Sequence, residues 1–248
     1  MATSTRPVVL VNDGSFYVGP NIARALAHKG FNLVVGDPTG ELVDDLRGIG
    51  ADVAVAEGVR DLARPESSLQ LVDVALSTFG RVDSAAMFSG RIVTGRFLQS
   101  TIDDLHAVTG GCIDAPYNFL KAVLPPMVEA GVGQVLVITS ASAARPTPGA
   151  PLYSAARAGA TMLVKNVALE MARHHVQVNA VGTNFMDFPE FLKASGATDP
   201  EVRKKIEAQV PLGRLGTLDE FASFCMPYLD GTSRFATGQF VAFAGGWA

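Results

Sequence analysis

The sequence predicts an α/β fold, a doubly wound parallel sheet of about seven strands with helices on both faces. Short runs of β-branched and apolar residues alternate with segments of helical periodicity along the chain, and this alternation is typical of βαβ units. Hydrophobic residues make up 48% of the 248 residues and charged residues 18%, which favours a compact core over disorder. No repeat, linker or low-complexity segment divides the chain, so we expect one domain over residues 1–248.

Each predicted strand is a short apolar run that ends in a polar or glycine-containing turn. The first, for example, is the β-branched run between Pro7 and the polar turn that begins at Asn12. Runs of this length between turn residues are typical of buried strands. The expected strands are 8–12, 32–35, 52–55, 84–88, 134–140, 177–181 and 238–243.

The helices between these strands carry start and stop signals. Gly30 and Gly80 follow two of them as terminating residues, and Thr217 with Glu220 has the spacing of a capping box. The longest helix is expected to bend near Pro116 and to end at Pro125-Pro126. The expected helices are 21–29, 41–47, 66–79, 102–123, 152–173 and 217–229, and the segment 182–209 is expected to be loop with short helices.

Three side chains near the end of the fifth predicted strand form a candidate catalytic site. Ser140 ends the strand, and Tyr153 and Arg157 lie four residues apart on one face of the next helix. A hydroxyl, a phenol and a permanent cation at one point suit proton transfer from a bound alcohol. Tyr153 would be the base, Ser140 would hydrogen-bond the substrate oxygen, and Arg157 would stabilise the phenolate. The alternative interpretation is a core aromatic residue beside a solvated cation.

The turn after the first strand is a poor match to a dinucleotide site. Such a site needs glycines, because the backbone must approach the pyrophosphate closely at a helix N-terminus. The turn reads Asn12-Asp-Gly-Ser-Phe-Tyr-Val-Gly19, in which Asp13 adds a negative charge and Tyr17 adds a ring. Asp37 at the end of the second strand is placed as a ribose-binding acid would be, but it is also an ordinary turn former before Pro38. A working site with Gly14 in the tight turn remains the alternative.

These motifs resemble those of the short-chain dehydrogenases/reductases, whose signature is Ser…Tyr-x-x-x-Lys, with Arg157 in place of the lysine. That family has Thr-Gly-x-x-x-Gly-x-Gly after its first strand, and this chain keeps only Gly19 in register. The arginine, together with the spacing Asn12-x4-Tyr17-x-Gly19, is similar to one branch, the halohydrin dehalogenases. The resemblance covers nearly the whole chain and implies a single Rossmann-like domain of this type.

The resemblance to halohydrin dehalogenases implies a lyase without a redox cofactor. Such an enzyme converts vicinal haloalcohols to epoxides with release of halide, and opens epoxides with azide, cyanide or nitrite. Ser140, Tyr153 and Arg157 would be its catalytic residues. Its halide and substrate would bind at Tyr17 and at the loop residues Thr183, Asn184, Phe185 and Met186. Two other hypotheses stay open, an NAD(P)-dependent oxidoreductase with a degenerate glycine motif and a non-catalytic binding protein of the same fold.

Composition limits the partners and the compartment. The formal net charge is −4 with no basic cluster, so a nucleic-acid partner is not expected. No apolar run approaches the length of a membrane helix. Cys112 and Cys225 lie far apart, outside any metal-ligand spacing, and are interpreted as reduced core thiols of a cytoplasmic protein. The resemblance also implies a homotetramer that packs through helices 102–123 and 152–173.

Overall fold

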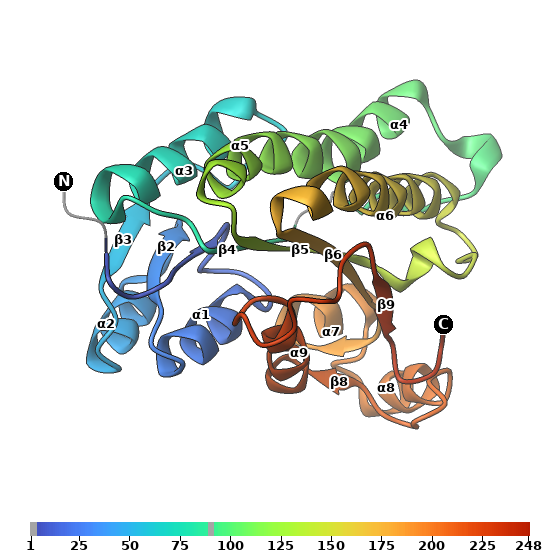
Figure 1. The fold of residues 1–248 in the computed structure, drawn as a ribbon. Helices are drawn as coiled ribbons and strands as arrows, with labels where there is room; N and C mark the ends of the chain where they lie inside the picture. The colour runs from blue at the N-terminus through green and yellow to red at the C-terminus, as the bar shows by residue number, and fades with distance from the viewer. Residues whose placement is uncertain (1–3, 89–91) are drawn as a thin grey trace.

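The computed structural model describes residues 4–88 and 92–248, and their main feature is a parallel sheet of seven strands (Figure 1). The strand order is β3-β2-β1-β4-β5-β6-β9. The chain adds β2 and β3 on one side of β1 and the later strands on the other side, as in a doubly wound sheet. The strands are β1 Val8–Val11, β2 Asn32–Gly36, β3 Val53–Ala56, β4 Ser84–Phe88, β5 Gly133–Ser140, β6 Val176–Thr183 and β9 Phe240–Phe243. The predicted fold class is confirmed.

Helices cover both faces of the sheet (Figure 1). On one face lie α1 Gly19–His28, α2 Gly40–Gly48 and α9 Leu218–Cys225. On the other lie α3 Pro65–Phe79, α4 Ile102–Thr109, α5 Ala115–Ala130 and α6 Pro151–Met171. Two further helices, α7 Pro189–Ser195 and α8 Pro200–Glu207, follow the loop after β6.

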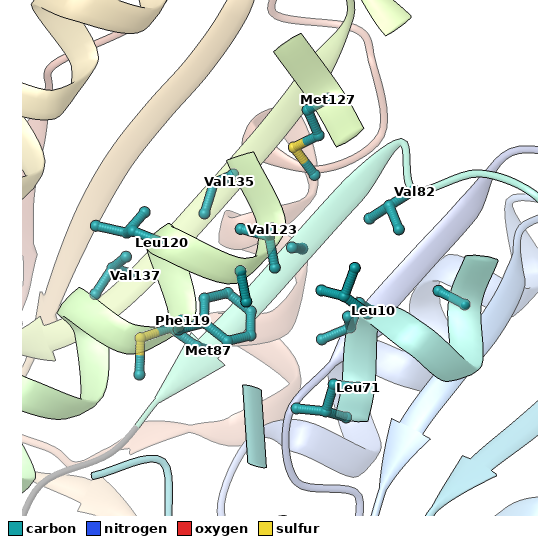
Figure 2. Close-up of a cluster of buried hydrophobic side chains, with 14 of the residues drawn as sticks. Leu10, Leu71, Val82, Met87, Phe119, Leu120, Val123, Met127, Val135 and Val137 are labelled. Carbon is teal, nitrogen blue, oxygen red and sulfur yellow. The ribbon is translucent and has the colours of Figure 1, made fainter. Parts of the chain in front are cut away.

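Most of the core lies in two large hydrophobic clusters, one on each face of the sheet, and β1 contributes to both. Val8 and Leu10 belong to the cluster under α3 and α5, whereas Val9 and Val11 belong to the cluster under α1 and α9. Successive side chains of a strand point to opposite faces, so a strand buried on both faces reads as a continuous apolar run. Figure 2 shows part of the first cluster, with Phe119 of α5 among the valines, leucines and methionines of the strands and helices around it.

Two predicted helix signals are confirmed. Gly80 adopts the left-handed conformation with φ 72° directly after α3. At the start of α9, the Thr217 hydroxyl accepts the backbone N–H of Glu220, and the Glu220 carboxylate accepts the backbone N–H of Thr217. The box satisfies donors that a helix start would otherwise leave without partners.

The predicted helix over 102–123 is wrong in two respects. It is interrupted by a π-helical segment at Gly110–Asp114 between α4 and α5. It also continues through Pro125 and Pro126 and ends only at Gly131, which has φ 67°. The two prolines remove two backbone donors, but the buried apolar face of α5 holds the last turn against the core.

A second, small sheet was not predicted. Met186–Asp187 (β7) pairs in parallel with Gly216–Thr217 (β8). Two-residue strands carry too little periodicity to be recognised in a sequence. The pair ties the loop after β6 to the start of α9, and so fixes one wall of the cavity described below.

Candidate active site

A cavity of about 1150 Å³ opens at the carboxyl ends of the central strands. Its walls come from the turn after β1, the loop after β3, the end of β4, the end of β5 with the start of α6, and the loop after β6. This is the position at which open α/β sheets bind ligands. All the predicted site residues lie on it, namely Tyr17, Ser140, Tyr153, Arg157, Thr183, Asn184, Phe185 and Met186. Ser89 and Gly90, which follow β4 in the sequence, lie outside the described residues.

Ser140 is the last residue of β5 and lies beside Thr183 of β6 in the sheet register. Its hydroxyl oxygen accepts the backbone N–H of Ser142 at 3.2 Å and the Ser142 hydroxyl at 2.9 Å. It lies 3.4 Å from the carbonyl oxygen of Thr183. Neighbouring Gly182 permits this approach, because a Cβ there would lie 2.6 Å from the Ser140 backbone. The hydroxyl is thereby fixed in orientation, as a substrate-positioning group must be.

Tyr153 and Arg157 lie on successive turns of α6, as predicted. The guanidinium carbon of Arg157 is 5.2 Å from the centre of the Tyr153 ring, within the range of a cation–π contact. Arg157 is only 6% exposed, so its charge acts on the phenol through a medium of low dielectric constant. The structure therefore brings these three side chains to one cavity.

The π-helical segment Gly110–Asp114 packs against this part of α6. Cys112 within it is buried in a small cluster with Val108 and Ala156, against which Tyr153 also packs. Gly159 of α6 allows the close contact, since a Cβ there would lie 2.9 Å from the Ile113 side chain. Burial raises the pKa of the Cys112 thiol. Cys225 is also buried and free, as predicted.

Tyr17 crosses the cavity from the turn after β1 to the end of β6. Its backbone has φ 50°, a left-handed conformation that costs a non-glycine residue about 1–2 kcal/mol. The Tyr17 hydroxyl donates to the Thr183 hydroxyl oxygen at 2.8 Å, and the ring packs against Phe188 and Phe88 at centroid distances of 4.8 and 5.8 Å. Burial raises the pKa of Tyr17, so the phenol stays protonated over the physiological pH range.

The remainder of this turn is bonded internally. The Asn12 amide exchanges two hydrogen bonds of 3.0 Å with the backbone of Phe88, which explains an asparagine at the end of β1. The Asp13 carboxylate accepts the backbone N–H of Ser15 at 2.9 Å and pairs with Arg60 at 3.2 Å. Sequence reasoning missed Arg60, because no motif connects a loop residue after β3 to the first turn. Its guanidinium offsets the negative charge predicted to repel phosphate.

The two glycines of the turn serve packing. A Cβ at Gly14 would lie 2.3 Å from the Val35 side chain, and the Gly14 N–H donates to the Gly36 carbonyl at 2.7 Å. A Cβ at Gly19 would lie 1.8 Å from the Asp13 carbonyl oxygen. A side chain at Gly19 would therefore clash with the backbone of the turn at the point where α1 begins.

Asp37, considered as a ribose-binding acid, has a role within the chain. Its carboxylate accepts the backbone N–H of Gly58 at 2.6 Å and that of Val59 at 2.9 Å. These bonds connect the end of β2 to the loop that carries Arg60.

The loop after β6 forms part of the cavity wall, and the C-terminal segment packs against it. The Phe185 N–H, one of the groups expected to hold an anion, already donates to the Asn184 side chain at 3.0 Å. The Phe185 ring contacts Trp247 edge-on at 5.6 Å. Arg145 holds Trp247 in place with a 2.5 Å hydrogen bond to its carbonyl oxygen and a cation–π contact of 4.7 Å. Trp247 thus packs against the cavity wall of its own chain. Phe188 and Phe191 also line the cavity.

Comparison with known proteins identifies the family. A family model described as enoyl-(acyl carrier protein) reductase matches residues 17–248. The chain belongs to this family, within the short-chain dehydrogenase/reductase superfamily.

Relatives of this superfamily member are similar over nearly their full length. The oxidoreductase UcpA of Salmonella typhimurium is 30% identical, over 96% of this chain and 95% of the relative. The 2,5-dichloro-2,5-cyclohexadiene-1,4-diol dehydrogenase LinX of Sphingobium indicum is 26% identical, over 97% of this chain and 96% of the relative. Among solved structures, the NADPH-dependent reductase YwfH has a TM-score of 0.88 at 20% identity, covering 98% of this chain and 99% of that one. This last similarity shows the fold.

These comparisons contradict the prediction of a cofactor-independent halohydrin dehalogenase. The relatives that match the superfamily member are dehydrogenases and reductases, so the lyase and epoxide chemistry expected from the sequence is wrong. The halohydrin dehalogenase prediction depended on two substitutions, Arg157 and Tyr17, whereas the relatives match nearly the whole chain. The coarser prediction, membership of the superfamily, is confirmed.

The first turn does not fit the diphosphate of a nicotinamide dinucleotide in the conformation that the structure shows. The Tyr17 ring lies across the cavity, and the N–H groups of Gly14 and Ser15 are bonded within the chain. A diphosphate at a helix N-terminus needs such donors directed outward and a backbone that it can approach. Asp13 and Tyr153 nevertheless line one cavity, and the Tyr17 ring is part of its wall. Within residues 4–88 and 92–248, no three His, Cys, Asp or Glu side chains are placed to hold a metal ion.

Proposed function

We propose that this protein is an oxidoreductase that interconverts a hydroxyl and a carbonyl group on an apolar substrate. Two kinds of support agree. The relatives are named as dehydrogenases, reductases and an oxidoreductase. The observation that carries the proposal is the buried Arg157 guanidinium 5.2 Å from the ring of Tyr153, at the wall of a cavity that Ser140 also lines.

Tyr153 would exchange a proton with the substrate oxygen. In the direction of reduction the phenol donates its proton to the developing alkoxide, and in the direction of oxidation the phenolate accepts the hydroxyl proton. Arg157 favours the phenolate by its charge, and arginine keeps that charge at any physiological pH. Ser140 would donate a hydrogen bond to the substrate oxygen, from a position fixed by Ser142 and by the end of β5.

The cavity walls favour an apolar substrate without phosphate or carboxylate groups. Beside Tyr153 and Ser140 they include Phe185, Met186 and Phe191. Apolar pockets with a few convergent polar groups orient a ligand by those groups and bind its body by burial. Cyclic or aromatic secondary alcohols and the matching ketones have this character. The hydride carrier of such a reaction would be a nicotinamide dinucleotide, for which the first turn is a poor fit as described above.

The proposal is tested by turnover of a panel of cyclic and aryl secondary alcohols and ketones with each of NAD⁺, NADP⁺, NADH and NADPH. We expect a change in nicotinamide absorbance that depends on the alcohol or ketone, and matching product by gas chromatography. Tyr153→Phe should reduce the rate by about a hundredfold or more. Turnover of no alcohol or ketone with any of the four carriers would refute the proposal, as would full activity of Tyr153→Phe.

A further inference from the structure

We infer that Tyr17 controls dinucleotide affinity: its side chain closes the cavity between the first turn and Thr183, and a dinucleotide binds only after the ring has moved. The inference rests on the proposed function, because that function requires a nicotinamide carrier. It concerns a different residue and a different measurement from those that test the proton transfer at Tyr153.

The closure is held at both ends of the tyrosine. At the backbone end Tyr17 has φ 50°, a conformation that favours glycine. At the other end its hydroxyl bonds to Thr183 at 2.8 Å. The Tyr17 ring packs between these two ends, with its centroid 4.8 Å from that of Phe188 and 6.2 Å from that of Phe221. Packing and a hydrogen bond thus hold the residue in a backbone conformation that it would not adopt by itself.

Charge near the turn does not prevent a diphosphate from binding once the ring has moved. Asp13 is 4% exposed and pairs with Arg60. The Arg60 side chain is 63% exposed and also donates to the Ser15 hydroxyl. It can therefore turn toward an incoming anion, for which a planar guanidinium is a suitable partner. The steric obstacle at the turn is the ring of Tyr17.

An equilibrium between closed and open turns lowers apparent affinity in proportion to the open fraction. If the closed form holds about nine-tenths of the molecules or more, removing the ring should tighten dinucleotide binding about tenfold or more. Tyr17→Gly does this without new strain, because glycine accepts φ 50°. Tyr17→Phe keeps the ring and removes only the bond to Thr183. Thr183→Val removes the same bond from the other side.

The experiment is titration calorimetry of the full chain and its variants with NADH and with NADPH. We expect the Kd of the better-bound dinucleotide to fall about tenfold or more in Tyr17→Gly, and by smaller, similar factors in Tyr17→Phe and Thr183→Val. His175→Gly is a matched control. His175 also has a left-handed backbone, with φ 59°, but it lies after α6 and does not line the cavity. The Kd of His175→Gly for the dinucleotide should equal that of the wild type.

The outcomes separate this inference from the proposed function. Equal Kd in the wild type and Tyr17→Gly, with both proteins folded by circular dichroism, would overturn the inference even if the wild type oxidises alcohols. Absence of binding in both would overturn it as well. Tighter binding by Tyr17→Gly without turnover in any variant would support the inference and refute the proposed function. If Tyr17→Gly does not fold, an unchanged Kd in both Tyr17→Phe and Thr183→Val would overturn the inference.

Discussion

Arg157 is the residue that most distinguishes this site from the Ser…Tyr-x-x-x-Lys pattern. Its charge lies beside the Tyr153 ring and is almost wholly buried. A buried charge acts more strongly than an exposed one, because little water screens it. At this position the positive charge of the guanidinium would stabilise negative charge on the Tyr153 oxygen.

Arg157→Gln should lower kcat/KM for the oxidation of an alcohol by about tenfold near neutral pH, which corresponds to about 1.4 kcal/mol. The phenolate becomes harder to form, so the loss should shrink as the pH rises. Arg157→Lys keeps a positive charge and should lose less. A pH–rate profile for each variant measures this. An equal loss at every pH in Arg157→Gln would mean that Arg157 only positions the substrate or the helix.

Alanine substitutions at Gly182 and at Gly48 test whether the close packing beside Ser140 requires glycine, with Gly48 as the unpacked control. Gly182→Ala places a Cβ 2.6 Å from the Ser140 backbone, so we expect a loss of about 1–3 kcal/mol in the free energy of unfolding. Gly48 ends α2 and has no atom within 4 Å of the corresponding Cβ. Gly48→Ala should be stabilising by about 0.4–1 kcal/mol. Urea denaturation measures both, and destabilisation by both would contradict the packing argument.

At the scale of elements, the sequence predicted most strands and helices to within a few residues. It did so because buried parallel strands are continuous apolar runs and because caps such as Thr217 with Glu220 are local. It failed where an element depends on distant contacts. The last turn of α5 stays helical despite Pro125 and Pro126 because the apolar face of the helix packs against the core. The strand β7 is defined by its pairing with β8, which is distant in the sequence.

The contribution of the α9 capping box to the stability of the fold depends on pH. A hydrogen bond from Arg214 lowers the pKa of Glu220 to about 2, well below its ordinary value, and the bonds with Thr217 act in the same direction. A carboxylate with a lowered pKa in the folded state stabilises the fold above its unfolded pKa. That stability is lost as the pH falls through the folded value. The relevant window therefore runs from about pH 5 down to about pH 2.

Glu220→Gln should be less stable than the wild type at about pH 6 and equally stable near pH 2, because the wild type loses the contribution of its carboxylate in this window. Thr217→Ala removes the capping hydroxyl and should cost about 1 kcal/mol near pH 2. It should cost more at about pH 6, where this hydroxyl also donates to the ionised Glu220 carboxylate. Chemical denaturation at several pH values measures the differences. If the difference in the free energy of unfolding between Glu220→Gln and the wild type does not change with pH, the charge of Glu220 does not contribute to stability.

At the scale of the whole molecule, the parallel direction of the strands followed from the βαβ pattern, whereas the function did not follow from single residues. Taken alone, Tyr17 and Arg157 indicate another chemistry, but the match of residues 17–248 to a reductase family contradicts that interpretation. The structure adds what no local pattern contains, namely that Tyr17 reaches Thr183 and that Arg60 offsets Asp13. Within residues 4–88 and 92–248, no helix is long and apolar enough to cross a membrane.

The exposed faces of α5 and α6 carry large apolar side chains, and we propose that they pack between subunits of a homotetramer. Tyr117 is 51% exposed, Met162 56% and Leu169 76%. Light scattering should give a mass of four times the 26.0 kDa chain. Tyr117→Glu combined with Leu169→Glu should reduce it, because charges in an apolar interface remain without partners. Leu69→Glu, at a 53% exposed leucine of α3, is the control. A monomeric wild type would contradict the proposal.

The π-helical segment Gly110–Asp114 has a consequence for how this gene can change. Each residue of an α-helix turns the chain by about 100°, and a π-helical turn holds an extra residue that offsets the helix before it from the helix after it. Deleting one codon between positions 110 and 114 would allow α4 and α5 to join as one regular helix. With α5 anchored in the core by Phe119, α4 would rotate instead. His106 and Ala107, which now line the cavity, would leave it, so a single-codon deletion could reshape the substrate wall while the sheet stays intact.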